Sequence, residues 1–204
     1  MKNFFSRRVN HEELDDRELV ALAKEDAEAF GELYARYVKK MYSYVYHRTG
    51  NRQDAEDLTA KVFSRAYAHI GKYVERGVPV QAWLYRIAHN LVANWHRDQS
   101  RRKIIALDDY VARSLQSEAP ERLAEDQEER DQLLAAVRRL PEDRQQLLLL
   151  KFIEQLPNEE IGEIMGRTEG AVKSLYHRTL LALREDMQRG PEAIQQRRLD
   201  GTEV

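Results

Sequence analysis

The sequence predicts an all-α protein made of two small helical domains joined by a flexible acidic linker. Apolar residues recur with the period of a helix through most of the chain, and no segment alternates with the period of a strand. The 204 residues include only nine glycines and five prolines, and 42% of them are hydrophobic. This composition favours helices with apolar stripes and argues against wholesale disorder. The length suits two domains of under ~100 residues each.

The first domain is expected to cover residues 15–103, after an extension of residues 1–14. Four helices are expected, at about 15–25, 26–49, 51–70 and 81–99. The second helix has apolar residues at each position of the helical template, namely Phe30, Leu33, Tyr34, Tyr37, Val38, Met41, Tyr42 and Val45. Gly50 should end this helix and Asn51 should cap the next one.

The second domain is expected to cover residues 121–189. The helical period is lost over 104–120, which indicates the linker, and a tail is expected at 190–204. One helix is expected over 121–140, and Pro141 should be the first residue of another that ends before Pro157. A short helix over 158–165 should stop at Gly166, and Thr168 should cap the last helix, which runs to about Arg189.

Several classes of function are excluded or disfavoured. Without cysteine, the chain forms neither disulfides nor thiolate metal sites. No apolar run approaches the ~18 residues of a membrane span, so we expect a soluble cytoplasmic protein without membrane insertion. Phosphate-binding glycine loops and the common hydrolase motifs are absent. His89 and His96 have no evident third ligand, so no metal, cofactor or catalysis is expected.

The charge is strongly patterned, although the net charge is only −2. Residues 85–103 hold five basic residues and one acid, and residues 167–184 hold four basic residues and one acid. Between them, residues 108–131 hold nine acids and three arginines. Local basic patches are the electrostatic footprint of nucleic-acid binding. Solvated helix faces with chance clustering are the alternative interpretation.

Residues 158–184 have the layout of a helix-turn-helix: a two-turn helix, a glycine, a short turn and a longer helix. In this motif the N-terminal residues of the second helix approach base edges in the major groove. The residues in that position are Arg167, Thr168, Glu169, Gly170, Lys173, Ser174, His177 and Arg178. Val172, Tyr176 and Leu183 should face inward. An ordinary helical hairpin with a glycine stop is the alternative.

One face of the helix expected at 81–99 is suited to a partly single-stranded nucleic acid. Its spacing brings together Arg86, Asn90, Asn94, Arg97 and Arg101, with a second row of Tyr85, His89 and His96, and Trp83 at the start. Arginine can neutralise phosphate, asparagine can read base edges, and aromatic rings can stack on unpaired bases. The alternative is a solvated face on which Trp83 covers the edge of the core.

An acidic group opens the helix expected at 51–70: Asp54, Glu56 and Asp57. Acids in the first turns of a helix interact favourably with its dipole, which by itself would explain them. A docking surface for a basic partner is the other interpretation.

Three segments, in order, resemble the extracytoplasmic-function (ECF, group IV) sigma factors of the sigma-70 family, over roughly residues 15–188. DAEDLTAKVFSRAY (54–67) resembles region 2.2, and AWLYRIAHNLVANWHRDQSRR (82–102) resembles regions 2.3 and 2.4. LPEDRQQLLLLKFIEQLPNEEIGEIMGRTEGAVKSLYHRTLLALR (140–184) resembles region 4. The resemblance implies an alternative sigma factor that binds core RNA polymerase, recognises the −10 and −35 promoter elements and promotes melting.

The resemblance also implies roles for individual residues. Docking on the largest polymerase subunit would fall on Asp54, Glu56, Asp57, Leu58, Val62 and Phe63. The −10 element and melted strand would contact Lys72, Arg76, Val78, Pro79, Trp83, Tyr85, Arg86, Asn90, Asn94, Arg97 and Arg101, with a flipped base held by the loop from Lys72 to Pro79. The helix-turn-helix residues named above would read the −35 element as duplex. The acidic linker resembles the family segment that runs towards the RNA exit path, and many members are held inactive by an anti-sigma factor.

The chain departs from the family pattern at several points. Leu175, Leu180 and Leu181 occupy positions that are commonly basic, so the −35 contact is weaker or these leucines pack on a partner. Pro157 replaces a common serine, and Asn158 is expected to cap the helix instead. The rival interpretations are a sigma-like mimic that titrates a regulator and a helix-turn-helix regulator with an unrelated N-terminal domain.

Overall fold

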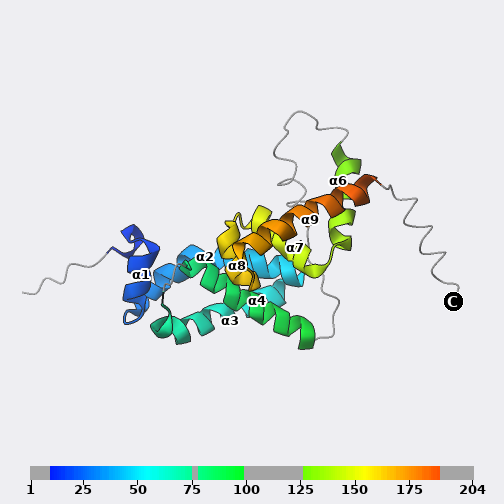
Figure 1. Cartoon of the computed structure of the whole chain (residues 1–204). Coiled ribbons are helices and arrows are strands. Elements are labelled where there is room, and N and C mark those ends of the chain that lie inside the picture. The colour runs from blue at the N-terminus through cyan, green and yellow to red at the C-terminus, as the bar shows by residue number, and fades with distance from the viewer. Residues whose placement is uncertain (1–9, 75–77, 99–125, 189–204) are drawn as a thin grey trace, which may run out of the picture. The chain divides into compact units, whose positions relative to one another are not determined.

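The computed structural model describes residues 10–74, 78–98 and 126–188, and within these ranges every regular element is helical (Figure 1). The chain divides into two compact units, the first holding α1 to α4 and the second α6 to α9. The predicted all-α fold with two helical domains is confirmed. The linker predicted at 104–120, the tail at 190–204 and residues 1–9 of the predicted extension lie outside the described residues.

The first unit contains η1 (His11–Glu13), α1 (Asp16–Ala23), α2 (Ala27–Thr49), α3 (Arg52–His69), η2 (Ile70–Lys72) and α4 (Val80–Asp98). Its helices begin where side chains can satisfy free backbone N–H groups. Asp15 and Glu18 form a capping box on α1. The predicted cap at Asn51 is confirmed, because its Oδ1 accepts a hydrogen bond from the Asp54 N–H at 3.0 Å.

Apolar stripes of the four helices form the core of the first unit. Leu19, Met41, Val62, Ala88 and Val92 are essentially inaccessible to solvent. α3 and α4 lie side by side, and their packing brings residues of both helices to one surface (Figure 1).

A polar network fastens the start of the chain to α2. The Arg36 guanidinium contacts the carboxylates of Glu32 and Asp16 at 2.9 and 3.0 Å and donates to the backbone oxygens of His11 and Glu12. The hydrogen bond to Glu32 is the main cause that raises the pKa of Arg36 above its ordinary value. The hydrogen bond to Asp16 and the negative charges of both acids raise it further, although partial burial acts in the opposite direction. This network fixes the position of α1 relative to α2.

The second unit contains α6 (Asp126–Arg139), α7 (Glu142–Leu148), a π-helical turn η3 (Leu149–Ile153), α8 (Asn158–Met165) and α9 (Glu169–Gln188). α9 packs on α6, α7 and α8. Ala136, Val137, Leu148 and Leu183 form a buried cluster to which Phe152 and Tyr176 add partly buried rings. The inward orientation predicted for Val172 and Leu183 is confirmed, and Tyr176 is half-buried.

Two predictions about helix ends in this unit are corrected. Pro141 precedes α7 as its N-cap instead of being its first residue. The α-helix then changes into the π-helical turn, and Gln155 adopts a positive φ of 53°. Asn158 does not cap α8, because it is the first helical residue and its Oδ1 accepts a hydrogen bond from Lys151 Nζ at 3.0 Å. Pro157 holds the N-cap position without a side-chain hydrogen bond.

Candidate nucleic-acid interface

The outer face of α4 carries the polar side chains that the sequence predicts there. Arg86, Asn90 and Arg97 are exposed, and Asn94 is half-buried. Arg97 donates a hydrogen bond to the Asn94 side-chain oxygen, which orients the guanidinium along the helix. Arg101 lies outside the described residues. This face therefore combines cationic and amide groups, which can contact phosphates and base edges respectively.

A hollow of about 350 Å³ opens between α3 and α4 beside this face. Arg65 and His69 of α3 line one side, and Trp83, Ile87 and Asn90 of α4 line the other. The backbone oxygen of Arg65 lies 2.9 Å from His69 Nδ1. The hollow thus offers an indole face, an apolar floor, an amide and a guanidinium within one small site, a combination suited to an unpaired base and its phosphate.

Sequence reasoning missed Arg65 and His69 as members of this site. The two residues are one helical turn apart on α3 and both are exposed. Their spacing could have shown that they share a face of α3. Only the packing of α3 on α4 shows that this face adjoins Trp83 and Asn90.

The loop before α4 is organised by Tyr73, which sequence reasoning also passed over. Its side chain is 8% exposed, and its hydroxyl donates a hydrogen bond of 2.6 Å to the Val78 backbone oxygen. Its ring lies 4.8 Å from the Trp83 ring, centroid to centroid. Tyr73 therefore fixes both ends of the loop against the first turn of α4. Lys72 and Pro79 are exposed and Val78 is half-buried, whereas Arg76 lies outside the described residues.

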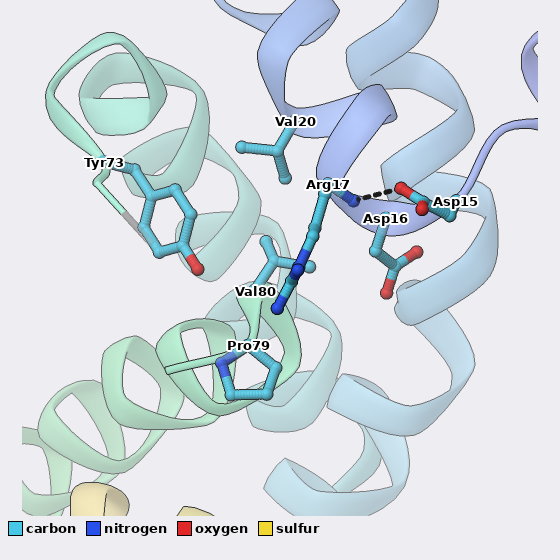
Figure 2. Close-up of a pocket in the computed structure, with 7 residues that line it drawn as sticks. All are labelled: Asp15, Asp16, Arg17, Val20, Tyr73, Pro79 and Val80. Carbon is cyan, nitrogen blue, oxygen red and sulfur yellow. Dashed lines mark hydrogen bonds between the residues drawn. The ribbon is translucent and has the colours of Figure 1, made fainter. Parts of the chain in front are cut away.

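A second hollow, of about 280 Å³, lies between this loop and the start of α1 (Figure 2). Its lining residues are Asp15, Asp16, Arg17, Val20, Tyr73, Pro79 and Val80. In Figure 2 the Arg17 side chain lies between Tyr73 on the left and Asp16 on the right. It extends towards Val80 and Pro79. Asp15 accepts a hydrogen bond from the Arg17 N–H at 2.9 Å, and Asp16 contacts Arg36. The two carboxylates are thus already used in holding α1.

The predicted contact of Tyr85 with the melted strand does not agree with the burial of its side chain. Tyr85 has no exposed surface, and its ring packs edge-on against Tyr44 of α2 at 5.3 Å. His96, in the same predicted row, is only 3% exposed. Both side chains belong to the core, so neither presents a face to a nucleic acid.

The acidic group on α3 divides into one structural and two exposed residues. Asp54 accepts a hydrogen bond from the Trp95 indole N–H at 3.3 Å, joining α3 to α4. Glu56 pairs with Arg52 at 2.9 Å, and this hydrogen bond raises the pKa of Arg52. Glu56 and Asp57 are exposed.

The three apolar residues of α3 that the resemblance assigns to polymerase docking are buried in the first unit. Leu58, Val62 and Phe63 are 4%, 0% and 5% exposed, because α3 directs this stripe into the core of the first unit. Their packing holds the face of α3 that carries Glu56 and Asp57 on the surface.

The helix-turn-helix predicted in the second unit has the expected geometry. Gly166 ends α8 with a φ of 65°, a left-handed conformation that favours glycine. The Arg167 N–H donates to the Gly162 oxygen at 2.8 Å, and a Cβ added at Gly162 would lie 2.6 Å from the Arg167 oxygen. Gly162, which sequence reasoning did not select, is therefore required for the turn to approach α8. The predicted cap is confirmed, since Thr168 Oγ1 accepts from the Ala171 N–H at 3.2 Å.

The predicted base-reading residues of the second unit all lie on its surface. The exposed set is Arg167, Thr168, Glu169, Gly170, Lys173, Ser174, His177 and Arg178. Two of the cations are held in ion pairs, Lys173 with Glu169 at 2.8 Å and Arg167 with Asp143 at 3.1 Å. Such exposed pairs contribute little stability, so both cations can exchange their partner for a phosphate at small cost.

The three leucines that depart from the family pattern occupy two environments. Leu175 is 4% exposed and packs into the core of the second unit. Leu180 and Leu181 are 39% and 46% exposed. Leu175 therefore anchors α9, and only the other two leave apolar surface where family members commonly carry charge.

The ranges that the structure describes hold no group of three His, Asp or Glu side chains that could bind a metal ion. In the same ranges, none of the helices combines the length and the apolar character needed to cross a membrane.

Comparisons with known proteins match both units. Residues 33–102 match the family Sigma-70 region 2, and residues 130–183 match Sigma-70, region 4. The ECF RNA polymerase sigma factor SigW of Bacillus subtilis is 30% identical over 174 residues, which cover 80% of this chain and 91% of SigW. The chain belongs to the ECF sigma factors of the sigma-70 family. This is a family of transcription initiation factors, not of enzymes.

Other ECF sigma factors are longer than the matched region. BldN of Streptomyces coelicolor is 36% identical over 158 residues, covering 78% of this chain and 60% of BldN. SigE of Mycolicibacterium smegmatis is 33% identical over 158 residues, covering 77% of this chain and 61% of SigE. The chain thus spans about three fifths of the length of these two relatives.

Solved structures agree on the fold. CnrH, in complex with the cytosolic domain of CnrY, matches with a TM-score of 0.57 at 21% identity over 83% of this chain and 95% of that one. RpoE of Bartonella quintana, in complex with the anti-sigma factor NepR, matches with a TM-score of 0.56 at 18% identity. The match covers 78% of this chain and 96% of RpoE. At these identities the likeness concerns the arrangement of helices.

Proposed function

We propose that this ECF sigma factor is a group IV alternative sigma factor of the cytoplasm that binds core RNA polymerase, recognises −10 and −35 promoter elements and promotes promoter melting. The observation that carries the proposal is the hollow between α3 and α4. It places Trp83, Asn90 and Arg65 together beside the cationic face of α4. The helix-turn-helix of the second unit supplies a separate surface of a kind that reads duplex DNA.

The first unit would act on melted DNA. Opening a promoter costs roughly 1.4 kcal/mol per base-pair step, and flipping a base costs a few kcal/mol more. Stacking of an unpaired base on an aromatic ring returns ~1–3 kcal/mol. In this proposal Trp83 receives the base, Asn90 contacts its edge and Arg65 binds its phosphate. Lys72, Arg86, Asn94 and Arg97 then bind the adjoining strand.

The second unit would position the holoenzyme on duplex DNA at the −35 element. Its exposed residues from Arg167 to Arg178 lie in the turn before α9 and in the N-terminal half of α9, and this is the end of a recognition helix that approaches base edges. Contacts from Lys173 and Arg178 to phosphates would make binding fall steeply as salt rises, because bound counterions are released.

The proposed partners are core RNA polymerase, promoter DNA and an anti-sigma factor. Glu56 and Asp57 are the exposed acids that we expect to face a basic surface of the polymerase. One solved structure similar in fold, RpoE of Bartonella quintana, is a complex of a sigma factor with an anti-sigma factor, which supports a similar mode of control here. No cofactor is required, and the chain itself catalyses no reaction in this proposal.

The test is transcription in vitro with bacterial core RNA polymerase and genomic fragments that include the promoter of the protein's own gene. We expect discrete transcription starts that appear only when the chain is added. Binding to core without any start would favour a sigma-like mimic. If the chain binds DNA but not core, a helix-turn-helix regulator becomes the better assignment.

A further inference from the structure

Two hollows of the first unit open along one face of α4. The hollow between α3 and α4 is lined by Trp83, Ile87 and Asn90 of that helix, and the hollow beside α1 is lined by Val80. These four residues are spaced by three, four and three positions, so they form one row along α4. With a rise of about 1.5 Å per residue, Val80 and Ile87 lie about 10 Å apart along the helix. A nucleic-acid strand that follows this row therefore meets both hollows.

Tyr73 contacts both hollows. It lines the hollow beside α1, and its ring packs on Trp83 with 4.8 Å between the ring centroids. Its hydroxyl donates a hydrogen bond of 2.6 Å to the Val78 backbone oxygen, which fixes the ring against the loop. Each hollow thus has an aromatic wall, Trp83 between α3 and α4 and Tyr73 beside α1. Aromatic walls of this kind stack on unpaired bases.

The hollow beside α1 differs from its neighbour in the polar groups that it offers. The Arg17 side chain is exposed and lies between Tyr73 and Asp16 (Figure 2). Asp15 uses one carboxylate oxygen, Oδ1, to accept hydrogen bonds of 2.9 Å from two backbone N–H groups of α1. Among the residues that the structure describes, nothing donates to its other oxygen, Oδ2. The hollow therefore combines a guanidinium, which only donates, with a carboxylate oxygen, which only accepts.

The polar groups of the hollow beside α1 match two of the four DNA bases. An arginine fork donates to two neighbouring acceptors of one base, and a carboxylate accepts from an amino group. Guanine has O6 and N7 as acceptors and an amino group, and cytosine has O2 and N3 as acceptors and an amino group. The amino group of adenine separates its acceptors, and thymine has no amino group. A volume of about 280 Å³ is close to the lower limit of ligand pockets, so the hollow suits a single base.

We propose that the hollow beside α1 holds a second base of the melted promoter strand, a guanine or a cytosine that Arg17 reads. This inference rests on the proposed function and extends the path of the strand from α4 to α1. The base stacks on Tyr73, Arg17 donates to its two acceptors, and Asp15 accepts from its amino group. Its phosphate stays outside the hollow, since the carboxylates of Asp15 and Asp16 repel an anion. Stacked nucleotides are spaced by about 3.4 Å, so the second base lies within about three nucleotides of the base bound at Trp83.

Arg17 allows a direct test, because its side chain is exposed and does not belong to the core. Arg17→Lys keeps the positive charge but removes the planar fork, and Arg17→Gln removes both. Lys24→Gln is the matched control for charge, since Lys24 is exposed at the C-cap of α1 and does not line the hollow. Circular dichroism and thermal unfolding establish that each variant is folded.

The measurement is the Kd of the holoenzyme for a probe with an unpaired −10 strand, taken from a promoter that the transcription test identifies. Each of the three positions on either side of the base bound at Trp83 is replaced in turn by all four bases. We expect one position at which guanine or cytosine binds about fivefold or more tightly than adenine and thymine. Both Arg17 variants should lose this preference, and Lys24→Gln should keep it.

Two results overturn the second base site and leave the sigma-factor assignment standing. One is the absence of a base preference at all of these positions, and the other is a preference that survives in both Arg17 variants. A wild-type chain that does not bind core RNA polymerase overturns the proposed function, and the second base site with it.

A free nucleotide is the other source of the same base, so guanosine and cytidine monophosphate are titrated into the full-length chain alone. We expect a Kd weaker than about 1 mM, because the strand no longer holds the base at the hollow. A micromolar Kd that the unpaired probe does not raise would show a site for a small ligand and overturn the contact with the strand.

Discussion

The two units present cationic surfaces of different shape. On the first, the exposed residues of α4 adjoin a hollow in which the half-buried ring of Trp83 is accessible. On the second, the exposed N-terminal part of α9 carries no aromatic residue from Glu169 to Leu175, and two neighbouring cations are already paired with acids. A hollow with an aromatic wall can hold a base only after it leaves the stack. A convex helix with polar side chains suits an intact groove. Shape, more than charge, therefore separates the proposed roles of the two units.

The largest expected effect comes from a glycine that only the second unit needs. In Gly162→Ala the new Cβ would lie 2.6 Å from the Arg167 backbone oxygen, so α8 and the turn must move apart. We expect the free energy of unfolding of this unit to fall by about 2–3 kcal/mol. Calorimetric or chemical unfolding of the full chain measures the loss.

Gly170→Ala is the control for stability, because a Cβ there meets nothing within 4 Å. It should cause no loss, since alanine is the better helix former. Equal destabilisation by both substitutions would show that the approach of the turn to Gly162 is not what stabilises the motif.

The second prediction separates the units by the DNA that they bind. Trp83→Ala removes the aromatic wall of the hollow and should raise the Kd of the holoenzyme for a probe with an unpaired −10 strand. The loss of ~1–3 kcal/mol of stacking corresponds to an increase in Kd of about fivefold to 150-fold. Binding to a fully duplex −35 probe should not change, and Trp83→Phe should recover part of the loss. A similar weakening on both probes would contradict a stacking role.

The sequence predicted most of the helices because their apolar residues recur with a helical period. The same residues form the buried face of each helix. The start of α3 followed from Asn51, and the turn of the helix-turn-helix followed from Gly166. The helix after Pro141 was predicted less well, because the change from α7 to the π-helical turn depends on packing within the second unit. Helical period alone does not show such a change.

Of the candidate site, the sequence predicted only the part that lies on one face of α4. Arg86, Asn90 and Arg97 share a face by spacing, and the structure leaves that face exposed. Tyr85 is next to this face in the same helix, yet the packing of Tyr44 of α2 buries it. Arg65 joins the site only through the contact of α3 with α4. Residues that lie together through tertiary packing leave no local pattern in the sequence.

The smallest expected effect tests whether Lys173 acts through its charge. Its pair with Glu169 is exposed, with 60% and 51% of the two side chains accessible, and joins residues one helical turn apart. Breaking it should cost the fold only ~0.3–0.5 kcal/mol. Lys173→Gln should weaken holoenzyme binding to a −35 duplex by a few-fold and reduce the salt slope by about 1, because one phosphate contact is lost.

The dependence on DNA sequence then distinguishes two ways in which Lys173 can act. A phosphate contact predicts the same weakening on a consensus and on a mutated −35 element, since phosphates carry no sequence information. A base contact predicts a loss that is confined to the consensus element. Glu169→Gln provides the reciprocal variant, because it frees Lys173 from its acid and should slightly strengthen binding at low salt. Weakening by Glu169→Gln would instead indicate that the carboxylate itself contacts a base, as acids can do with cytosine.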